Sequence, residues 1–303
     1  MKFLKDVKAN FPLLIMAAPC FIWFIIFHYL PMFGVIIAFK DYNYVDGIFG
    51  SPWVGFKNFE YLFNTSDAYI ITRNTILYSV GGIFLGIILA VSLAIVFDML
   101  GKTKVSRVNQ TIVLLPHFLS WVVISYFVFG LLSVDKGVFN NIIKSFGGEA
   151  VNWYAEPKVW PFILIILSMW KNVGFNSIIY YSTIRGFDLE YYEAAKIDGA
   201  TWWQTITKIT IPMLKPTLVI LFIMNMGSVL RSDFGLHYII TKNSGMLYSV
   251  TSTLDTYIYN GMTGLGDMGA TAAAGFYQSI VGFAMVMFTN WVSKKVSKEI
   301  SLF

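Results

Sequence analysis

Six stretches of about twenty apolar residues constrain this 303-residue chain more than any other feature. A helix of that length can cross a bilayer, and a soluble domain rarely contains several such runs. Only 13% of the residues are charged, whereas soluble proteins average about a quarter. The chain is therefore predicted to span a membrane over residues 12–39, 75–97, 111–133, 161–183, 213–230 and 270–292.

Helices are the structure these stretches favour, because strand-like alternation is absent over any comparable length. We expect an all-α membrane protein, with one transmembrane domain over residues 1–303. The first stretch is superficially similar to a lipoprotein signal ending at Cys20, but Pro19 occupies the place of a small residue and apolar sequence continues to Phe39. We interpret it as an uncleaved first helix.

Lysine and arginine predict the orientation of the spans. They are denser in alternate segments, represented by Lys5, Lys104, Lys196 and Lys295. By the positive-inside rule these segments, and hence both the N- and C-termini, are expected in the cytoplasm. The net charge of +5 is thus interpreted as a topology signal, and no nucleic-acid partner is expected because a soluble basic face is lacking.

The sequence contains no complete pattern for catalysis or metal binding. The single Cys20 excludes an internal disulfide and any site built from several thiolates. Gly101–Thr103 matches only the end of a phosphate-binding loop, since Val96 stands where its first glycine should be. The histidines lie in separate segments: His28, His117 and His237. We expect no enzyme activity, metal or cofactor in this chain; any nucleotide would be bound by a partner.

The inner loop over residues 184–212 is polar but has helical periodicity. Asp188 is placed to cap a short helix, which Gly199 would end in the left-handed conformation. Thr201 and Gln204 fit a capping box that opens a second helix. The pattern predicts helix–turn–helix along the cytoplasmic surface, between the fourth and fifth spans. Periodicity alone would equally suit an amphipathic helix among lipid headgroups.

A motif in this loop favours a docking role. Tyr192–Ala195, followed by Asp198–Ala200, resembles the EAA signature of permease subunits of ATP-binding cassette importers, in the form found in the carbohydrate branch. Ile37–Lys40 and Trp53–Phe59 are similar to the same family, although Ile211 replaces the usual leucine before the proline. The resemblance assigns ATPase coupling to these residues: Glu193, Ala194, Ala195, Asp198, Gly199 and Ala200.

The resemblance implies a membrane-spanning permease of a bacterial cell membrane that moves a sugar or oligosaccharide inward by alternating access. It also implies two ATPase subunits, a second and usually different permease chain, and an extracellular solute-binding protein. Two local alternatives remain. Glu193 could pair with Lys196 along its helix, which is worth only a few tenths of a kcal/mol. Asp198 could equally be a turn residue or a partner contact.

Polar residues within two spans are candidates for the sugar pathway. Asn172 and Asn225 lie at similar distances from the inner ends of the fourth and fifth spans, roughly 18–20 Å from the inner surface. Amides hydrogen-bond to sugar hydroxyls and aromatic rings stack on sugars. The candidates are Asn172, Phe175, Asn225 and Ser228. Packing between helices is the alternative role. The neighbouring Lys171 is expected either to snorkel or to face a wet cavity.

Two other classes of membrane protein are alternatives to an importer permease. An ion-coupled secondary transporter would be expected to carry carboxylates within its spans, and these spans contain almost none. A membrane scaffold without transport activity would leave the spacing of the inner-loop motif unexplained. The sequence does not predict which sugar is carried.

Overall fold

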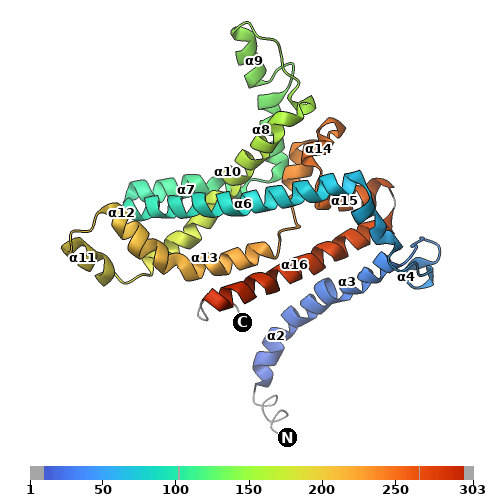
Figure 1. Ribbon diagram of the computed structural model, residues 1–303, viewed down its shortest axis with the longest axis horizontal. Coiled ribbons are helices and arrows are strands. Elements are labelled where there is room, and N and C mark those ends of the chain that lie inside the picture. The colour runs from blue at the N-terminus through green and yellow to red at the C-terminus, as the bar shows by residue number, and fades with distance from the viewer. Residues whose placement is uncertain (1–9, 102, 266, 297–303) are drawn as a thin grey trace. The chain divides into compact units, whose positions relative to one another are not determined.

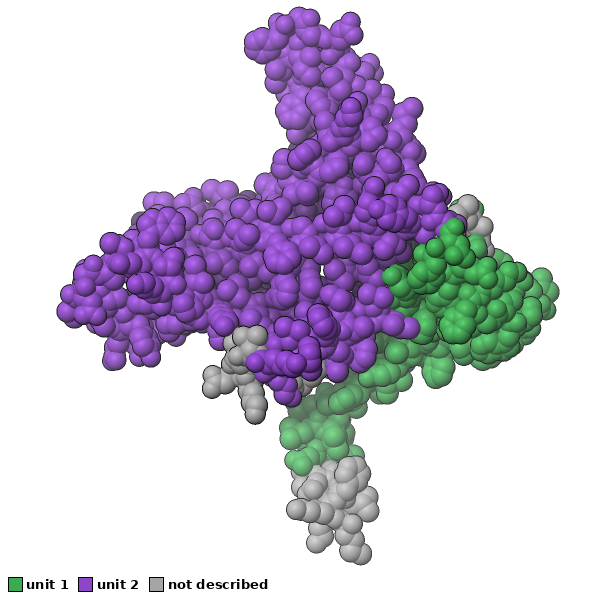
Figure 2. All heavy atoms as spheres, viewed as in Figure 1, with its two compact units in different colours: residues 1–64, 258–277 green, residues 65–257, 278–303 purple. Residues whose placement is uncertain are grey.

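The computed structural model describes residues 10–101, 103–265 and 267–296. The predicted cytoplasmic lysines Lys5, Lys102 and Lys298 lie outside the described residues. The described part is helical apart from turns and one isolated β-bridge between Lys40 and Trp53. Five helices are long and apolar enough to cross a membrane, or six if one bent pair forms a single span. The all-α prediction with about six spans is therefore confirmed. Figure 2 colours the two compact units of the chain.

Unit 1 comprises residues 1–64 and 258–277. Its first span runs over Phe11–Phe39 and contains α2 (Phe11–Phe24), α3 (Leu30–Met32) and the tighter turn η2 (Phe33–Phe39) (Figure 1). The loop that follows is held by Lys40, whose ammonium donates to the carbonyls of Ile48 and Phe49, each at 2.8 Å. Asn58 donates to the carbonyls of Ala38 and Lys40 at 3.0 and 2.8 Å. These bonds replace the regular backbone pairing that an irregular loop lacks.

Unit 2 comprises residues 65–257 and 278–303 and carries most of the helices in Figure 1. They are α6 (Ser66–Met99), α7 (Lys104–Phe118), α8 (Trp121–Leu132), α9 (Val138–Ser145), α10 (Trp160–Arg185), α11 (Glu190–Ile197), α12 (Trp202–Thr205), η6 (Ile206–Thr210), α13 (Ile211–Met226), η7 (Gly235–Ile240), α14 (Tyr248–Thr251) and the later part of α16 (Met268–Val296).

Helix α10 is the centre of unit 2, since it packs along both α6 and α7. Small residues permit this close contact. Ala90 and Ala94 of α6 are fully buried in a cluster with Tyr180 of α10 and Leu214 of α13. At Gly174 of α10, an added methyl group would lie 2.0 Å from a backbone oxygen of α7. Helices α7 and α10 are thus held at near backbone contact.

The predicted third span over residues 111–133 is divided between two helices. The chain bends by 96° between α7 and α8. Leu119 and Ser120 have extended backbone conformations there, and the Ser120 side chain accepts a hydrogen bond from the N–H of Val123 to cap α8. The cap supplies the polar partner that a new helix start requires, which an apolar-run criterion does not detect.

Two other boundaries differ from the predicted ones. Helix α6 begins at Ser66 instead of residue 75, because Thr65 caps it by accepting from the N–H of Ala68. Helix α13 ends at Met226, whereas the prediction continued to residue 230. Residues 227–233 form turns and irregular backbone. Such backbone at membrane depth is tolerated where it is buried in protein or lines a cavity.

Candidate functional site

A cavity of about 390 Å³ lies within unit 2, among α6, α10, α13 and the irregular segment after α13. Its polar lining includes Asn172, Asn225 and Ser228, so three of the four predicted pathway residues share one cavity. The amides of Asn225 and the hydroxyl of Ser228 have no side-chain hydrogen bond within the described part of the chain. Asn172 donates only to Ser168 of its own helix, at 3.1 Å. These residues therefore do not act by bridging helices.

Phe175 does not line this cavity. Its ring stacks on His117 of α7, with ring centroids 4.4 Å apart, and it borders a separate shallow hollow. Asn176 lines the cavity in its place. Residues four apart on a helix lie on nearly the same face. Asn172 and Asn176 therefore both line the cavity, whereas the adjacent Phe175 does not. The i, i+4 pair of asparagines is the sequence signal that would have found Asn176.

The segment 227–233 adds residues to the cavity that the sequence did not indicate: Arg231, Ser232 and Asp233. Helices α6 and α16 hold this segment. Its carbonyl groups accept hydrogen bonds from Ser79 of α6 at 3.0 Å and from Gln278 of α16 at 2.7 Å. The backbone of the segment is consequently fixed beside the cavity.

Charge in the lining is concentrated on Arg231 and Asp233. His237 also lines the cavity, but burial lowers the pKa of its imidazole to about 4, so that the ring is neutral near pH 7. Asp233 accepts hydrogen bonds from the indole N–H of Trp121 at 2.8 Å and from the N–H of Leu236 at 3.3 Å. The Asp233 carboxylate is thus held against α8 and the start of η7.

The buried Lys171 neither snorkels nor lines the cavity, contrary to both alternatives drawn from the sequence. Its ammonium donates to the carbonyls of Pro116 at 3.4 Å and His117 at 3.0 Å, and also to that of Leu119. It lies 5.2 Å from the centroid of the Trp121 ring. Lys171 therefore supplies a donor to the carbonyls at the bend between α7 and α8, of which that of Pro116 also accepts from the N–H of Leu119.

The inner loop forms the predicted pair of helices. Helix α11 ends at Ile197, and Gly199 follows with φ of +74°. The N–H of Ala200 donates to the carbonyl of Ala195 at 2.9 Å and that of Gly199 to Lys196 at 3.2 Å, which is the Schellman arrangement. Asp188 contributes a bond to the N–H of Glu190 at 3.1 Å.

The next helix opens with the predicted capping box. Thr201 and Gln204 exchange side-chain and backbone bonds of 2.7 and 3.4 Å. That helix continues through η6 into α13, so the second half of the loop and the fifth span form one rod over Trp202–Met226. The second half of the loop is therefore continuous with a helix that lines the cavity.

Most of the residues assigned to ATPase coupling are exposed: Glu193, Ala194, Asp198 and Gly199. Ala195 is buried and Ala200 is half-buried, because both face the loop's own interior. Glu193 and Lys196 are not within ion-pair distance, although both are described. The intrahelical pairing considered from the sequence is thus absent, and Glu193 is free to meet a partner.

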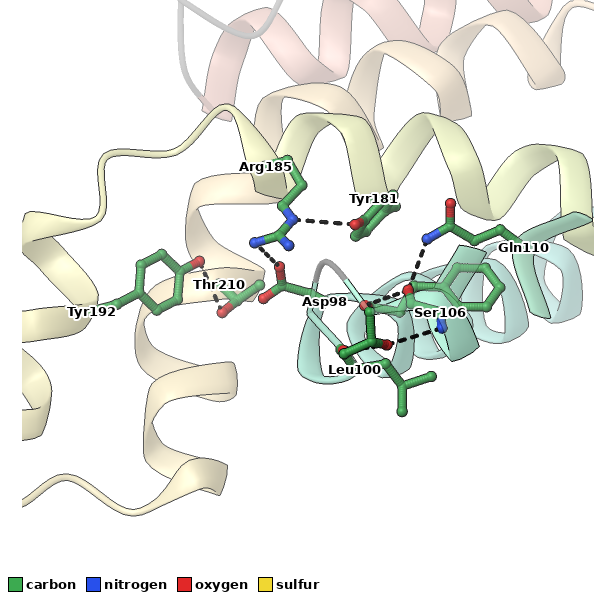
Figure 3. Close-up of polar contacts among 10 residues, drawn as sticks. Asp98, Leu100, Ser106, Gln110, Tyr181, Arg185, Tyr192 and Thr210 are labelled. Carbon is green, nitrogen blue, oxygen red and sulfur yellow. Dashed lines mark hydrogen bonds and ion pairs between the residues drawn. The ribbon is translucent and has the colours of Figure 1, made fainter. Parts of the chain in front are cut away.

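Polar contacts join the base of this loop to the cavity helices (Figure 3). The hydroxyls of Tyr192 and Thr210 lie 3.3 Å apart and link α11 to the start of α13. Arg185 at the end of α10 pairs with Asp98 at the end of α6 at 3.4 Å and donates to the Tyr181 hydroxyl at 3.2 Å. The inner ends of the two main cavity helices are therefore joined beside the loop.

Comparison with known proteins identifies the family. A family model described as "Binding-protein-dependent transport system inner membrane component" matches residues 82–298. The chain belongs to this family. This transport-system inner membrane component is also 33% identical to the "Polygalacturonan/rhamnogalacturonan transport system permease protein YteP" of Bacillus subtilis (strain 168), over 95% of this chain and 89% of that protein.

Two solved structures resemble this inner membrane component over nearly all its length. One is a bacterial ABC transporter involved in the import of the acidic polysaccharide alginate, with a TM-score of 0.87 and 33% identity over 98% of this chain and 100% of that chain. The other is a bacterial alginate ABC transporter in complex with an alginate pentasaccharide-bound periplasmic protein, with a TM-score of 0.87 and 32% identity over 98% and 99% of the two chains. The resemblance predicted from the inner-loop motif is confirmed, and the chain is a multi-pass inner membrane permease.

Proposed function

We propose that the cavity of unit 2 binds a sugar during its passage through the membrane. The observation that carries this proposal is the convergence of Asn172 and Asn176 of α10, Asn225 of α13 and Ser228 of the turn after α13 on one cavity. Amides and hydroxyls without partners on other helices are suited to bind the hydroxyl groups of a saccharide. The relatives named above, which transport or import polysaccharides, support the same class of cargo.

The energy for transport comes, in this proposal, from two separate ATPase subunits that bind ATP and Mg²⁺. They dock on the exposed face of α11, where Glu193 offers a charge and Gly199 allows close approach. The continuous helix from Trp202 to Met226 and the Asp98–Arg185 pair would carry the movement to the cavity walls. Both termini and this loop lie in the cytoplasm.

The complete importer further contains a second permease chain and an extracellular solute-binding protein. One permease supplies only part of a pathway, and a partner chain would close the exposed side of the helices. The alginate transporter captured with its loaded periplasmic protein supports this assembly by analogy. The binding protein would deliver the saccharide to the outer end of the cavity.

Replacing Asn225 by Ala tests the sugar site in proteoliposomes that contain the complete importer. We expect uptake of the cargo at limiting concentration to fall roughly fivefold, since one hydrogen bond is worth about 1 kcal/mol. Co-purification of the ATPase subunits should not change. Asn141→Ala, at an exposed position on α9, is the matched control and should keep full uptake. Equal uptake by both variants and the native protein would remove the cavity from the pathway.

A further inference from the structure

Arg231 lines the cavity at an exposed position, and its side chain has no ion-pair or hydrogen-bond partner among the described residues. Charged side chains beside a membrane cavity commonly mark the path of a substrate. The other described arginines near the cavity helices are engaged. Arg73 donates to Asn74 and to the carbonyl of Ser249, and Arg185 pairs with Asp98. Arg231 is thus the cation with free donors that faces this cavity.

The acidic residues closest to Arg231 in sequence are bound elsewhere. Asp233 accepts from Trp121 and from the backbone of Leu236. Asp255 of α15 (Leu254–Asn260) accepts from the N–H and the hydroxyl of Ser232, at 2.5 and 2.9 Å. Each carboxylate already has two hydrogen-bond donors and lies outside ion-pair distance of Arg231. Their arrangement fixes the backbone on both sides of Arg231 and leaves the guanidinium unneutralised.

The backbone at Arg231 is itself immobilised. Its carbonyl accepts a hydrogen bond from Ser79, and the carbonyl of Leu230 accepts one from Gln278. Its N–H donates to the carbonyl of Ser228 at 2.8 Å. A long side chain on a fixed loop loses less conformational freedom on binding than one on a mobile loop. This is the arrangement expected of a residue that recognises a ligand.

We propose that Arg231 binds a carboxylate of the cargo, and that the cargo is therefore an acidic oligosaccharide containing uronic acid residues; this rests on the proposed sugar site. A guanidinium forms paired hydrogen bonds to a carboxylate, while the amides of Asn172, Asn176 and Asn225 take the hydroxyls. A sugar phosphate fits less well, because its charge of about −1.5 to −2 at pH 7 exceeds that of one guanidinium and would repel Asp233.

The test compares two trisaccharides in proteoliposomes containing the complete importer: trigalacturonate and its carboxyl-reduced, neutral counterpart. For the native protein we expect uptake of the acidic sugar to exceed that of the neutral sugar by on the order of tenfold. Arg231→Gln should lower acidic uptake by about the same factor and leave neutral uptake within about twofold. Arg231→Lys should recover part of the preference, since it keeps the charge but not the paired donors.

Lys215→Gln, at an exposed position on α13, removes the same charge outside the cavity and should keep the native preference. If Arg231→Gln also keeps the preference, the binding protein alone selects the cargo and the role given to Arg231 is overturned, while the sugar site stands. If the native importer takes up neither sugar but Asn225→Ala still impairs its own cargo, only the substrate class is wrong. If Asn225→Ala is also without effect, the proposed sugar site is contradicted as well.

Discussion

The inner loop is held by contacts between residues close in sequence, whereas the cavity is formed by residues far apart in sequence. The loop lies within residues 184–212, and its bonds join residues close in sequence, as in the Thr201–Gln204 capping box and the Ala195–Ala200 bond. The cavity gathers residues from α6, α10, α13 and the turn after α13, and these come together only through packing. Local chemistry thus fixes the loop, whereas contacts between distant helices fix the cavity.

Lys171→Met is expected to have the largest effect, because it removes contacts between helices that are distant in sequence. Loss of the ammonium leaves the carbonyls of His117 and Leu119 at the α7–α8 bend without this donor, while that of Pro116 keeps the N–H of Leu119. We expect the free energy of unfolding to fall by on the order of 2–5 kcal/mol, with loss of transport. Thermal unfolding in detergent measures it. Lys208→Met, at an exposed position, is the control; equal stability of the two variants would show that the bend holds without Lys171.

Gly199→Val disturbs the local backbone conformation of the inner loop. The φ of +74° places this residue in the left-handed region, where a β-branched side chain costs about 1–2 kcal/mol. We expect normal membrane insertion but loss of the ATPase subunits or of cargo-stimulated ATP hydrolysis. Gly199→Asn should stay nearly active, because asparagine tolerates this conformation. Unimpaired hydrolysis and uptake in Gly199→Val would contradict the docking role and favour the alternative that the loop is an amphipathic surface helix.

The smallest effects are expected from two adjacent residues of α10 that face different ways. Asn176→Ala should lower uptake roughly fivefold by removing a hydrogen bond worth about 1 kcal/mol. Phe175→Leu should leave uptake within about twofold and weaken only the stacking on His117. Concentration-dependent uptake of the cargo separates them. The reverse order would mean that the cargo contacts the Phe175 face of α10.

Much of the fold follows from the sequence because membrane insertion depends on apolar length, which is a property of continuous residues. The bend at Leu119–Ser120 escapes that criterion, since the average hydrophobicity of residues 111–133 does not reveal where hydrogen bonding between successive turns stops. Lys171 lies fifty-two residues from Leu119 along the chain. Only the packing of α10 against α7 brings its ammonium to the broken turn.

The sequence by itself determined the helical class, the approximate positions of the spans and the geometry of the inner loop, because each depends on neighbouring residues. It also predicted that Asn172 and Asn225 lie at one depth. The tertiary structure decided which face of α10 lines the cavity, and so replaced Phe175 with Asn176. It likewise decided that Arg231 is unpaired, because that depends on whether Asp233 and Asp255 find donors on other helices. Side-chain direction and charge pairing are properties of packed neighbours, which a linear pattern does not contain.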